Sequence, residues 1–258
     1  MLGAERQLEN FMQVSIDRNE FESIYNKHIM EREFVEYRDY YVQAKSRYWR
    51  SLNTYAAHGP TQPGSKILDI GGGQMGIMAK HLFKADAMAA DAVLDAESDV
   101  SNAGIEMRQL NLMADSYDLG TTFDGIIMCE VIEHLPVPPY IIMQKLATLL
   151  KPGGVLFMTT PNGFRIRNVM YMLANKEILG IYRYAEPGEV LGHQHEYTAH
   201  QMAWQTERAG LELLAMDMVD PGWRGASTGA KLAHVLTKPF NLWPHLRSHL
   251  FISVRKPA

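Results

Sequence analysis

Hydrophobic and polar positions follow two different rhythms along the chain, and the change between them comes near residue 60. In the segment EFVEYRDYYVQAKSRYW, apolar side chains recur at spacings of three and four residues, at Phe34, Tyr37, Tyr41, Ala44 and Tyr48. This spacing predicts one apolar face of a helix. The face either packs against the main domain or belongs to a cap whose tyrosines line a substrate cavity.

A cluster of breaker residues, GPTQPGS at 59–65, marks a domain boundary. We predict an N-terminal helical cap over residues 1–60 and a main domain over residues 61–258. Two stretches of the main domain, at about 162–195 and 221–245, are rich in aromatic residues, glycines and prolines and do not fit a minimal sheet domain. Their length is typical of lids or substrate loops.

From Lys66 onward, short apolar runs alternate with helical patterns. Seven runs of strand length are predicted, at Ile67–Ile70, Ala87–Ala90, Ile105–Leu110, Phe123–Met128, Val155–Thr160, Leu211–Val219 and Leu250–Val254. Helical patterns lie at Gln74–Phe83, Pro138–Leu150 and Thr198–Ala209. This alternation predicts an α/β fold with a mostly parallel sheet covered by helices on both faces. Ligands of such sheets bind beyond the carboxyl ends of the strands.

Composition narrows the class of partner and the compartment. The formal net charge is −4 and no basic aromatic tract is present, which argues against a nucleic-acid partner. The single cysteine, Cys129, excludes an internal disulfide and favours a reducing compartment. No apolar run is long enough for a membrane span, and the N-terminus lacks a signal pattern. We therefore expect a cytoplasmic, soluble protein.

The stretch KILDIGGGQMG places three glycines directly between the first strand of the main domain and its helix. Backbone without Cβ atoms lets a ligand approach closely, and a helix N-terminus offers free N–H groups. The next strand ends in Asp91, an acid that can accept hydrogen bonds from a ribose diol. The spacing of Gly71, Gly73 and Gly76 also satisfies the dinucleotide pattern, so the motif alone leaves a dinucleotide and another nucleoside cofactor as alternatives.

Four elements in order carry a family resemblance, namely LDIGGG, the acid Asp91, FDGIIMCEVIEH and KPGG. The series resembles the class I S-adenosylmethionine (SAM)-dependent methyltransferases, which implies a Rossmann-like fold and SAM as cofactor. The chain departs from the family at Met75, where a glycine is usual, and at Asn111, where an aspartate is common. The resemblance implies a set of cofactor-binding residues: Asp69, Gly71, Gly72, Gly73, Asp91 at the ribose, Asn111 and Leu112 at the adenine, and Cys129 and Glu130.

The segment CEVIEHL brings three side chains to one helical face, because Glu130, Glu133 and His134 stand at i, i+3 and i+4. Two carboxylates and an imidazole can hold a divalent cation such as magnesium, manganese or zinc. The pattern is similar to that of the ubiquinone-biosynthesis O-methyltransferases and of small-RNA 3′-terminal 2′-O-methyltransferases, which implies a metal next to the acceptor hydroxyls. Downstream, GHQHEYT supplies His193 and His195, and the resemblance implies His193 as a further ligand.

Three roles remain open for this group. Glu133, His134, His193 and His195 are candidates to hold a metal, to act as base or positioning groups without one, or to be structural. Arg47, in KSRYWR, is a candidate to reach the SAM carboxylate from the N-terminal cap.

The expected activity is methyl transfer from SAM to a hydroxyl of a small molecule, such as a sugar, a phenol or quinol, or a secondary metabolite. The alternatives are N-methylation of an amine, 2′-O-methylation of RNA, and a SAM-binding regulatory protein without catalysis. The sequence leaves the oligomeric state open, with a homodimer as one alternative.

Overall fold

The computed structural model describes residues 15–31, 38–178, 192–221, 235 and 237–258. Within them, one seven-stranded sheet has the strand order β3-β2-β1-β4-β5-β7-β6. Neighbouring strands are parallel except at β7, which runs antiparallel to both β5 and β6. The α/β class and the mostly parallel sheet are therefore confirmed.

The strands follow the predicted apolar runs closely. They are β1 Lys66–Ile70, β2 Asp86–Asp91, β3 Glu106–Gln109, β4 Phe123–Cys129, β5 Leu150–Pro161, β6 Glu212–Val219 and β7 His249–Arg255. The largest difference is at β5, which begins at Leu150 and includes the KPGG turn. A register shift opposite Phe123 and Gly125 accommodates these extra residues.

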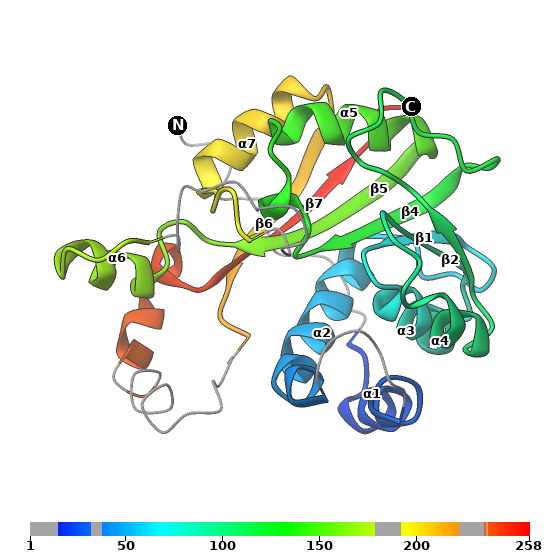
Figure 1. The fold of residues 1–258 in the computed structure, drawn as a ribbon, viewed down its shortest axis with the longest axis horizontal. Helices are drawn as coiled ribbons and strands as arrows, with labels where there is room; N and C mark the ends of the chain where they lie inside the picture. The colour runs from blue at the N-terminus through cyan, green and yellow to red at the C-terminus, as the bar shows by residue number, and fades with distance from the viewer. Residues whose placement is uncertain (1–14, 32–37, 179–191, 222–234, 236) are drawn as a thin grey trace.

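The helices pack on both faces of the sheet (Figure 1). The described helices are α1 Arg18–Tyr25, α2 Arg38–His58, α3 Gln74–Phe83, α4 Glu97–Asn102, α5 Pro139–Leu149, α6 Ile166–Leu173 and α7 Ala199–Arg208. A π-helical turn, η1 Asn26–Met30, continues α1, and the 3-10 turns are η2 Ile132–His134, η3 Lys238–Leu242 and η4 Pro244–Leu246. In Figure 1, α5 and α7 cover one face, and α1 to α4 lie on the other.

Two hydrophobic clusters correspond to these two faces. Neighbouring residues of a strand point to opposite faces, so Ile67 and Ile127 join the cluster with α1 to α4, whereas Leu68 and Ile126 join the cluster with α5 and α7. Because both faces are covered, the central strands are apolar throughout rather than alternating, as is typical of parallel sheets.

The N-terminal helices belong to the first of these clusters. The apolar face predicted for α2 is buried at Tyr41, Ala44 and Tyr48, and it continues through Leu52 and Tyr55. Full burial of a side chain of the size of Leu52 contributes about 1.5–3 kcal/mol. The predicted members Phe34 and Tyr37 lie outside the described residues, as do parts of both predicted insertions. The described parts of the insertions include α6, η3 and η4.

Candidate functional site

The three glycines after β1 form a tight bend at the carboxyl edge of the sheet. Gly71, Gly72 and Gly73 have φ angles of 102°, 70° and 85°, a region in which side chains are strained. A Cβ on Gly73 would lie 2.5 Å from a Val100 methyl group, so the bend packs directly on α4. The bend leads into α3, and β1 lies between β2 and β4, where the strand order reverses. This is the position at which ligands of doubly wound sheets bind.

Asp69 lies beneath the bend with its side chain buried. Its Oδ2 accepts a hydrogen bond of 2.8 Å from the amide of Gly76. Burial raises the pKa of Asp69 to about 7, although backbone hydrogen bonds from Gly76 and Met75 act in the opposite direction. Asp69 therefore ties β1 to the first turn of α3 and fixes the shape of the bend.

Asp91, at the end of β2, lies against the same bend. Its Oδ2 accepts from the amide of Gly72 at 2.8 Å, and its Oδ1 accepts from the amide of Ala92 at 2.6 Å. The parallel pairing of β1 with β2 produces this meeting, because Ile70 is in register with Ala90. The glycine motif and Asp91, which are separate in the sequence, are thus adjacent in space.

A cavity of about 600 Å³ opens in front of this arrangement. The lining includes residues from the bend, from β2, from α2 and from the end of β4, among them Asp69, Gly71, Gly72, Asp91, Arg47, Cys129, Glu130 and His134. Burial raises the pKa of the Cys129 thiol, so this cysteine remains a neutral wall residue.

The two residues expected at the adenine do not belong to this lining. Asn111 is exposed, and its Oδ1 accepts from the amide of Met113 at 2.9 Å within a local turn. Leu112 is buried in the hydrophobic cluster of α5 and α7. Spacing along the chain correctly puts both near the carboxyl edge of the sheet but does not determine which way their side chains turn.

Glu130 is the polar centre of the cavity wall after β4. Its Oε2 lies 2.9 Å from Nη1 of Arg47 and 3.3 Å from Nε2 of His249, and its Oε1 accepts from the Thr159 hydroxyl at 2.8 Å. Burial alone would raise the pKa of Glu130, but Arg47 and His249 outweigh it and hold the pKa far below its usual range. Glu130 has a left-handed φ of 56°, which is rare outside glycine.

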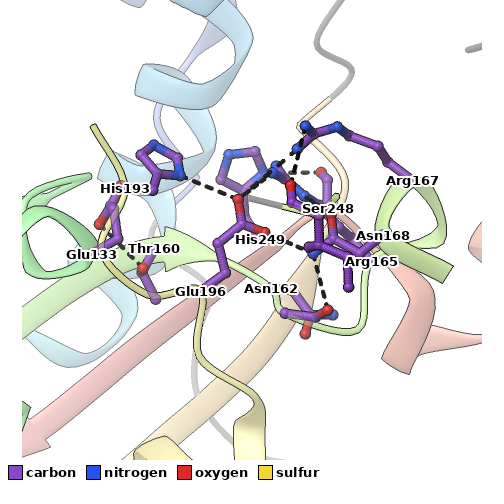
Figure 2. Close-up of polar contacts among 12 residues, drawn as sticks. Glu133, Thr160, Asn162, Arg165, Arg167, Asn168, His193, Glu196, Ser248 and His249 are labelled. Atoms are coloured by element: carbon purple, nitrogen blue, oxygen red, sulfur yellow. Dashed lines mark hydrogen bonds and ion pairs between the residues drawn. The ribbon is translucent and has the colours of Figure 1, made fainter. Parts of the chain in front are cut away.

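Glu133, His134 and His193 form a separate cluster. One possible ligand atom from each lies within 4.8 Å of the others. Glu133 is fully buried, and its Oε2 accepts from the Thr160 hydroxyl at 3.1 Å while its Oε1 has no hydrogen-bond partner (Figure 2). His134 Nε2 lies 4.0 Å from that Oε1. Burial, and then the Glu130 carboxylate, raise the pKa of Glu133 well above its usual range.

This cluster differs in two members from the expected sets. Glu130, expected as a metal ligand, does not join it, because its carboxylate is engaged by Arg47, His249 and Thr159. His195, expected as a catalytic residue, is exposed, and its ring lies 4.6 Å from that of Tyr197. The remaining set of one carboxylate and two imidazoles, with a buried carboxylate oxygen that lacks a partner, suits a divalent cation.

A second cavity of about 530 Å³ adjoins the first, and both are lined by Tyr40, Arg47, Glu130 and His134. Besides these, its lining includes Glu133, His193 and His249, the start of α6 at Arg165, Ile166 and Arg167, and side chains near β6 and β7 such as Asp220 and Ser248. The cluster of Glu133, His134 and His193 therefore lies in the second cavity, at its junction with the first.

Glu196 is a buried carboxylate behind this second cavity that the sequence patterns did not single out. It accepts from His193 Nδ1 at 3.1 Å and from Asn168 Nδ2 at 2.7 Å, and it forms an ion pair with Arg165 (Figure 2). Burial alone would raise the pKa of Glu196, but His193 and Arg165 outweigh it and lower the pKa. Because Nδ1 of His193 is held by Glu196, its Nε2 is the nitrogen left for a ligand.

His249 is the other residue that sequence reasoning missed. The predicted last strand begins at Leu250, one residue too late, and so leaves out the histidine that pairs with Glu130 from β7. A polar residue at the start of an otherwise apolar strand was the available signal. For Glu196, the signal was its position three residues after His193, but only the fold shows that both turn inward.

Several known proteins resemble this chain in sequence. A family model described as a methyltransferase domain matches residues 35–216. The ubiquinone biosynthesis O-methyltransferase of Colwellia psychrerythraea is 27% identical over 148 residues, which cover 51% of this chain and 59% of that protein. The chain spans about half the length of the curated relatives it matches.

Solved structures resemble the chain in fold. The magnesium protoporphyrin IX methyltransferase of Synechocystis PCC 6803, determined with bound S-adenosylhomocysteine, superposes with a TM-score of 0.55 at 12% identity, over 92% of this chain and 93% of that one. A 4+2 cyclase superposes with a TM-score of 0.57 at 15% identity, over 88% and 85%. Identities this low concern the fold alone. Among the described residues, no helix combines the length and apolar character needed to cross a bilayer.

Proposed function

This chain belongs to the methyltransferase-domain family, in the class I SAM-dependent group, and from that premise we propose that it transfers a methyl group from SAM to a hydroxyl group of a small molecule. The observation that carries the proposal is the pair of adjoining cavities, whose common wall includes Glu130 and His134. One cavity contains the glycine bend and Asp91, and the other contains Glu133 and His193.

The first cavity is the proposed cofactor site. Its glycine backbone and helix N-terminus suit the close approach of a nucleoside, and Asp91 is a ribose acceptor at the end of the neighbouring strand. SAM supplies an electrophilic methyl group that needs no activation by the protein. The protein's task is to align the acceptor oxygen with that group and to exclude water.

Arg47 and Glu130 form the fixed part of the junction. Their ion pair is largely buried, with side-chain exposures of 11% and 15%, and His249 and Thr159 hold the same carboxylate. A carboxylate with this many donors keeps its charge and its orientation. We propose that this pair shapes the passage between the cavities, with Arg47 near the cofactor's methionine part.

Glu133, His134 and His193 are the proposed acceptor group, and they are suited to hold a divalent cation. Such a cation would lower the pKa of the acceptor hydroxyl and orient it. Thr160 holds one oxygen of Glu133 and Glu196 holds one nitrogen of His193, which supports a defined orientation of both side chains. The Colwellia relative is named as an O-methyltransferase, which supports a hydroxyl acceptor.

A measurement of S-adenosylhomocysteine production tests the proposal. The panel contains catechols, sugars and small amines, each assayed after chelation by EDTA and again after addition of magnesium, manganese or zinc. We expect turnover with a hydroxylated member and its recovery on addition of a cation. Turnover of amines alone would contradict the hydroxyl acceptor, and full turnover in chelator would contradict the metal while leaving methyl transfer intact.

A further inference from the structure

The acceptor cavity has a cationic wall at the start of α6. Arg165 and Arg167 both line the cavity there, on either side of Ile166. Both guanidinium groups face the same carboxylate, that of Glu196, which also accepts from His193 (Figure 2). One negative charge is therefore shared by two permanent positive charges and an imidazole.

The two arginines are engaged to very different degrees. Arg165 is largely buried, forms the close ion pair with Glu196 and also donates from Nε to Asn168 at 3.3 Å. Arg167 approaches Glu196 only to 4.0 Å, and its side chain is 45% exposed. Its guanidinium lies 4.8 Å from the ring centroid of Tyr171, and Nη2 lies 3.5 Å from the Ile178 carbonyl.

These contacts orient Arg167 without neutralising it. An aromatic ring holds the guanidinium in place, and a carbonyl accepts weakly from it, but neither carries a full negative charge. Among the described residues, Glu196 is the carboxylate opposite Arg167, and Arg165 lies much closer to that carboxylate than Arg167 does. The start of α6 adds the positive end of a helix dipole at the same wall. The wall thus carries an excess of positive charge.

On the other walls of the cavity, the charged side chains leave no excess of positive charge. The carboxylate of Glu130 is matched by Arg47 and His249. Asp220, near the ends of β6 and β7, adds a carboxylate that accepts from the neutral Ser248 hydroxyl at 3.2 Å. The positive excess is therefore local to α6, and it lies in the same cavity as Glu133 and His193.

We infer that the methyl acceptor carries an anionic group, a carboxylate or a phosphate, that binds Arg167 at the start of α6 while the hydroxyl group lies at Glu133, His134 and His193. A planar guanidinium recognises either anion through paired hydrogen bonds. The inference deepens the proposed function and rests on it, because it names the class of molecule that fills the acceptor cavity. It makes Arg167 a residue that selects the acceptor.

Thermal unfolding with two probe anions tests this site without requiring methyl transfer. Benzoate and inorganic phosphate are added separately in the presence of saturating S-adenosylhomocysteine, with sodium chloride at matched ionic strength as the reference. We expect at least one probe to raise Tm with a saturating concentration dependence, because a ligand that binds the folded state stabilises it. Benzoate as the active probe would indicate a carboxylate acceptor, and phosphate would indicate a phosphate ester.

Arg167→Gln provides the decisive comparison. Loss of a charge-assisted pair is expected to weaken the apparent affinity for the active probe about tenfold or more. Arg167→Lys should recover part of it, and Arg255→Gln, which removes an exposed guanidinium on β7 paired with Glu212, serves as the control for net charge. Arg165 is left unchanged because its loss would also release Glu196.

Two results would overturn the inference. One is a wild-type protein that neither probe stabilises beyond chloride, and the other is an Arg167→Gln variant that keeps the wild-type response. The proposed function is judged separately in the same samples. A rise of Tm with S-adenosylhomocysteine alone supports the cofactor site, whether or not the anions bind.

Discussion

Glu130 and Glu133 lie three residues apart, yet their carboxylates have opposite electrostatic surroundings. Glu130 is surrounded by donors, including Arg47, and its pKa is lowered, whereas Glu133 has a buried oxygen without a partner and its pKa is raised. The left-handed φ of Glu130 contributes to this separation by turning the chain sharply between β4 and η2. Similar residues in one short motif therefore have different proposed tasks.

The isosteric change Glu133→Gln tests the task of the second carboxylate. It removes the ability to ionise while keeping the shape and an oxygen that can accept from Thr160. We expect kcat to fall about 100-fold or more, in the range of a lost acid–base or orienting group, with an unchanged Kd for SAM by calorimetry. Glu212→Gln, an exposed carboxylate on β6, is the matched control. Wild-type kcat in Glu133→Gln would remove Glu133 from the mechanism.

Asp69 gives a prediction for stability against pH. Its pKa in the folded protein is about 7, above its ordinary value of 3.8. The folded state therefore binds more protons than the unfolded state between these values, and stability falls as pH rises from about 4 to 7. Asparagine does not titrate, so Asp69→Asn lacks this dependence of stability on pH. We expect the free energy of unfolding of the variant, measured relative to wild type, to be higher at pH 8 than at pH 5 by an amount on the order of 2–3 kcal/mol.

Urea unfolding of both proteins at pH 5 and at pH 8 measures how the stability difference between variant and wild type changes with pH. Because each protein is compared with itself across pH, a constant cost from the altered hydrogen bond to Gly76 cancels. If variant and wild type differ in free energy of unfolding by the same amount at pH 5 and at pH 8, Asp69 stays ionised throughout this range.

At the scale of elements, the glycine bend connects β1 to α3 and contacts β2 and α4 as well. Its amides meet Asp91, and Gly73 leaves no room for a side chain beside Val100. Four elements therefore depend on one short loop. This is why a glycine motif of a few residues predicts the shape of the chain at this edge of the sheet.

Gly73→Ala and Gly64→Ala separate backbone strain from close packing. Both positions have left-handed φ angles, 85° and 79°, but a Cβ at Gly64 meets nothing within 4 Å. We expect Gly64→Ala to cost about 1–2 kcal/mol from strain alone, with normal SAM affinity. Gly73→Ala should cost about 1–3 kcal/mol more from overpacking and should weaken SAM binding. Equal stability and equal SAM affinity in the two variants would contradict this account of the bend.

On the scale of the whole molecule, the N-terminal helices and the sheet share one hydrophobic cluster. Tyr55 of α2 is fully buried, with ring centroids 6.1 Å from those of Phe83 in α3 and Phe157 in β5. Arg47, from the same helix, reaches the junction of the two cavities. Helix α2 thus connects the core to the site. The domain boundary near residue 60 stays a prediction, and the hydrophobic core is continuous across it.

This shared core predicts cooperative unfolding. In urea, far-UV circular dichroism and tryptophan fluorescence, with Trp49 in α2 and Trp204 in α7, should report one coincident transition. Tyr55→Ala should lower the free energy of unfolding by about 3–5 kcal/mol, whereas Val42→Ala on the exposed side of α2 should change it by about 0.5 kcal/mol or less. Two separate transitions would instead support an independent N-terminal cap.

The sequence alone determined the sheet and the glycine bend at its carboxyl edge, and it proposed the cofactor region and the acceptor group, because each depends on local information. Strand and helix periods, the glycines and the EVIEH pattern are visible within a few residues, and parallel α/β order places strand ends at one edge. It thereby indicated that Asp91 lies near the glycine bend and Glu133 near His134.

Only the tertiary structure decided which side chains turn toward one another. It paired Glu130 with Arg47 and His249, left Glu133 for His134 and His193, turned Asn111 and His195 outward, and brought Glu196 between Arg165 and His193. These contacts join residues up to 119 positions apart, from Glu130 to His249, and depend on rotamers and burial. The spacing of hydrophobic and polar residues does not predict such contacts, because they form between elements that lie far apart along the chain.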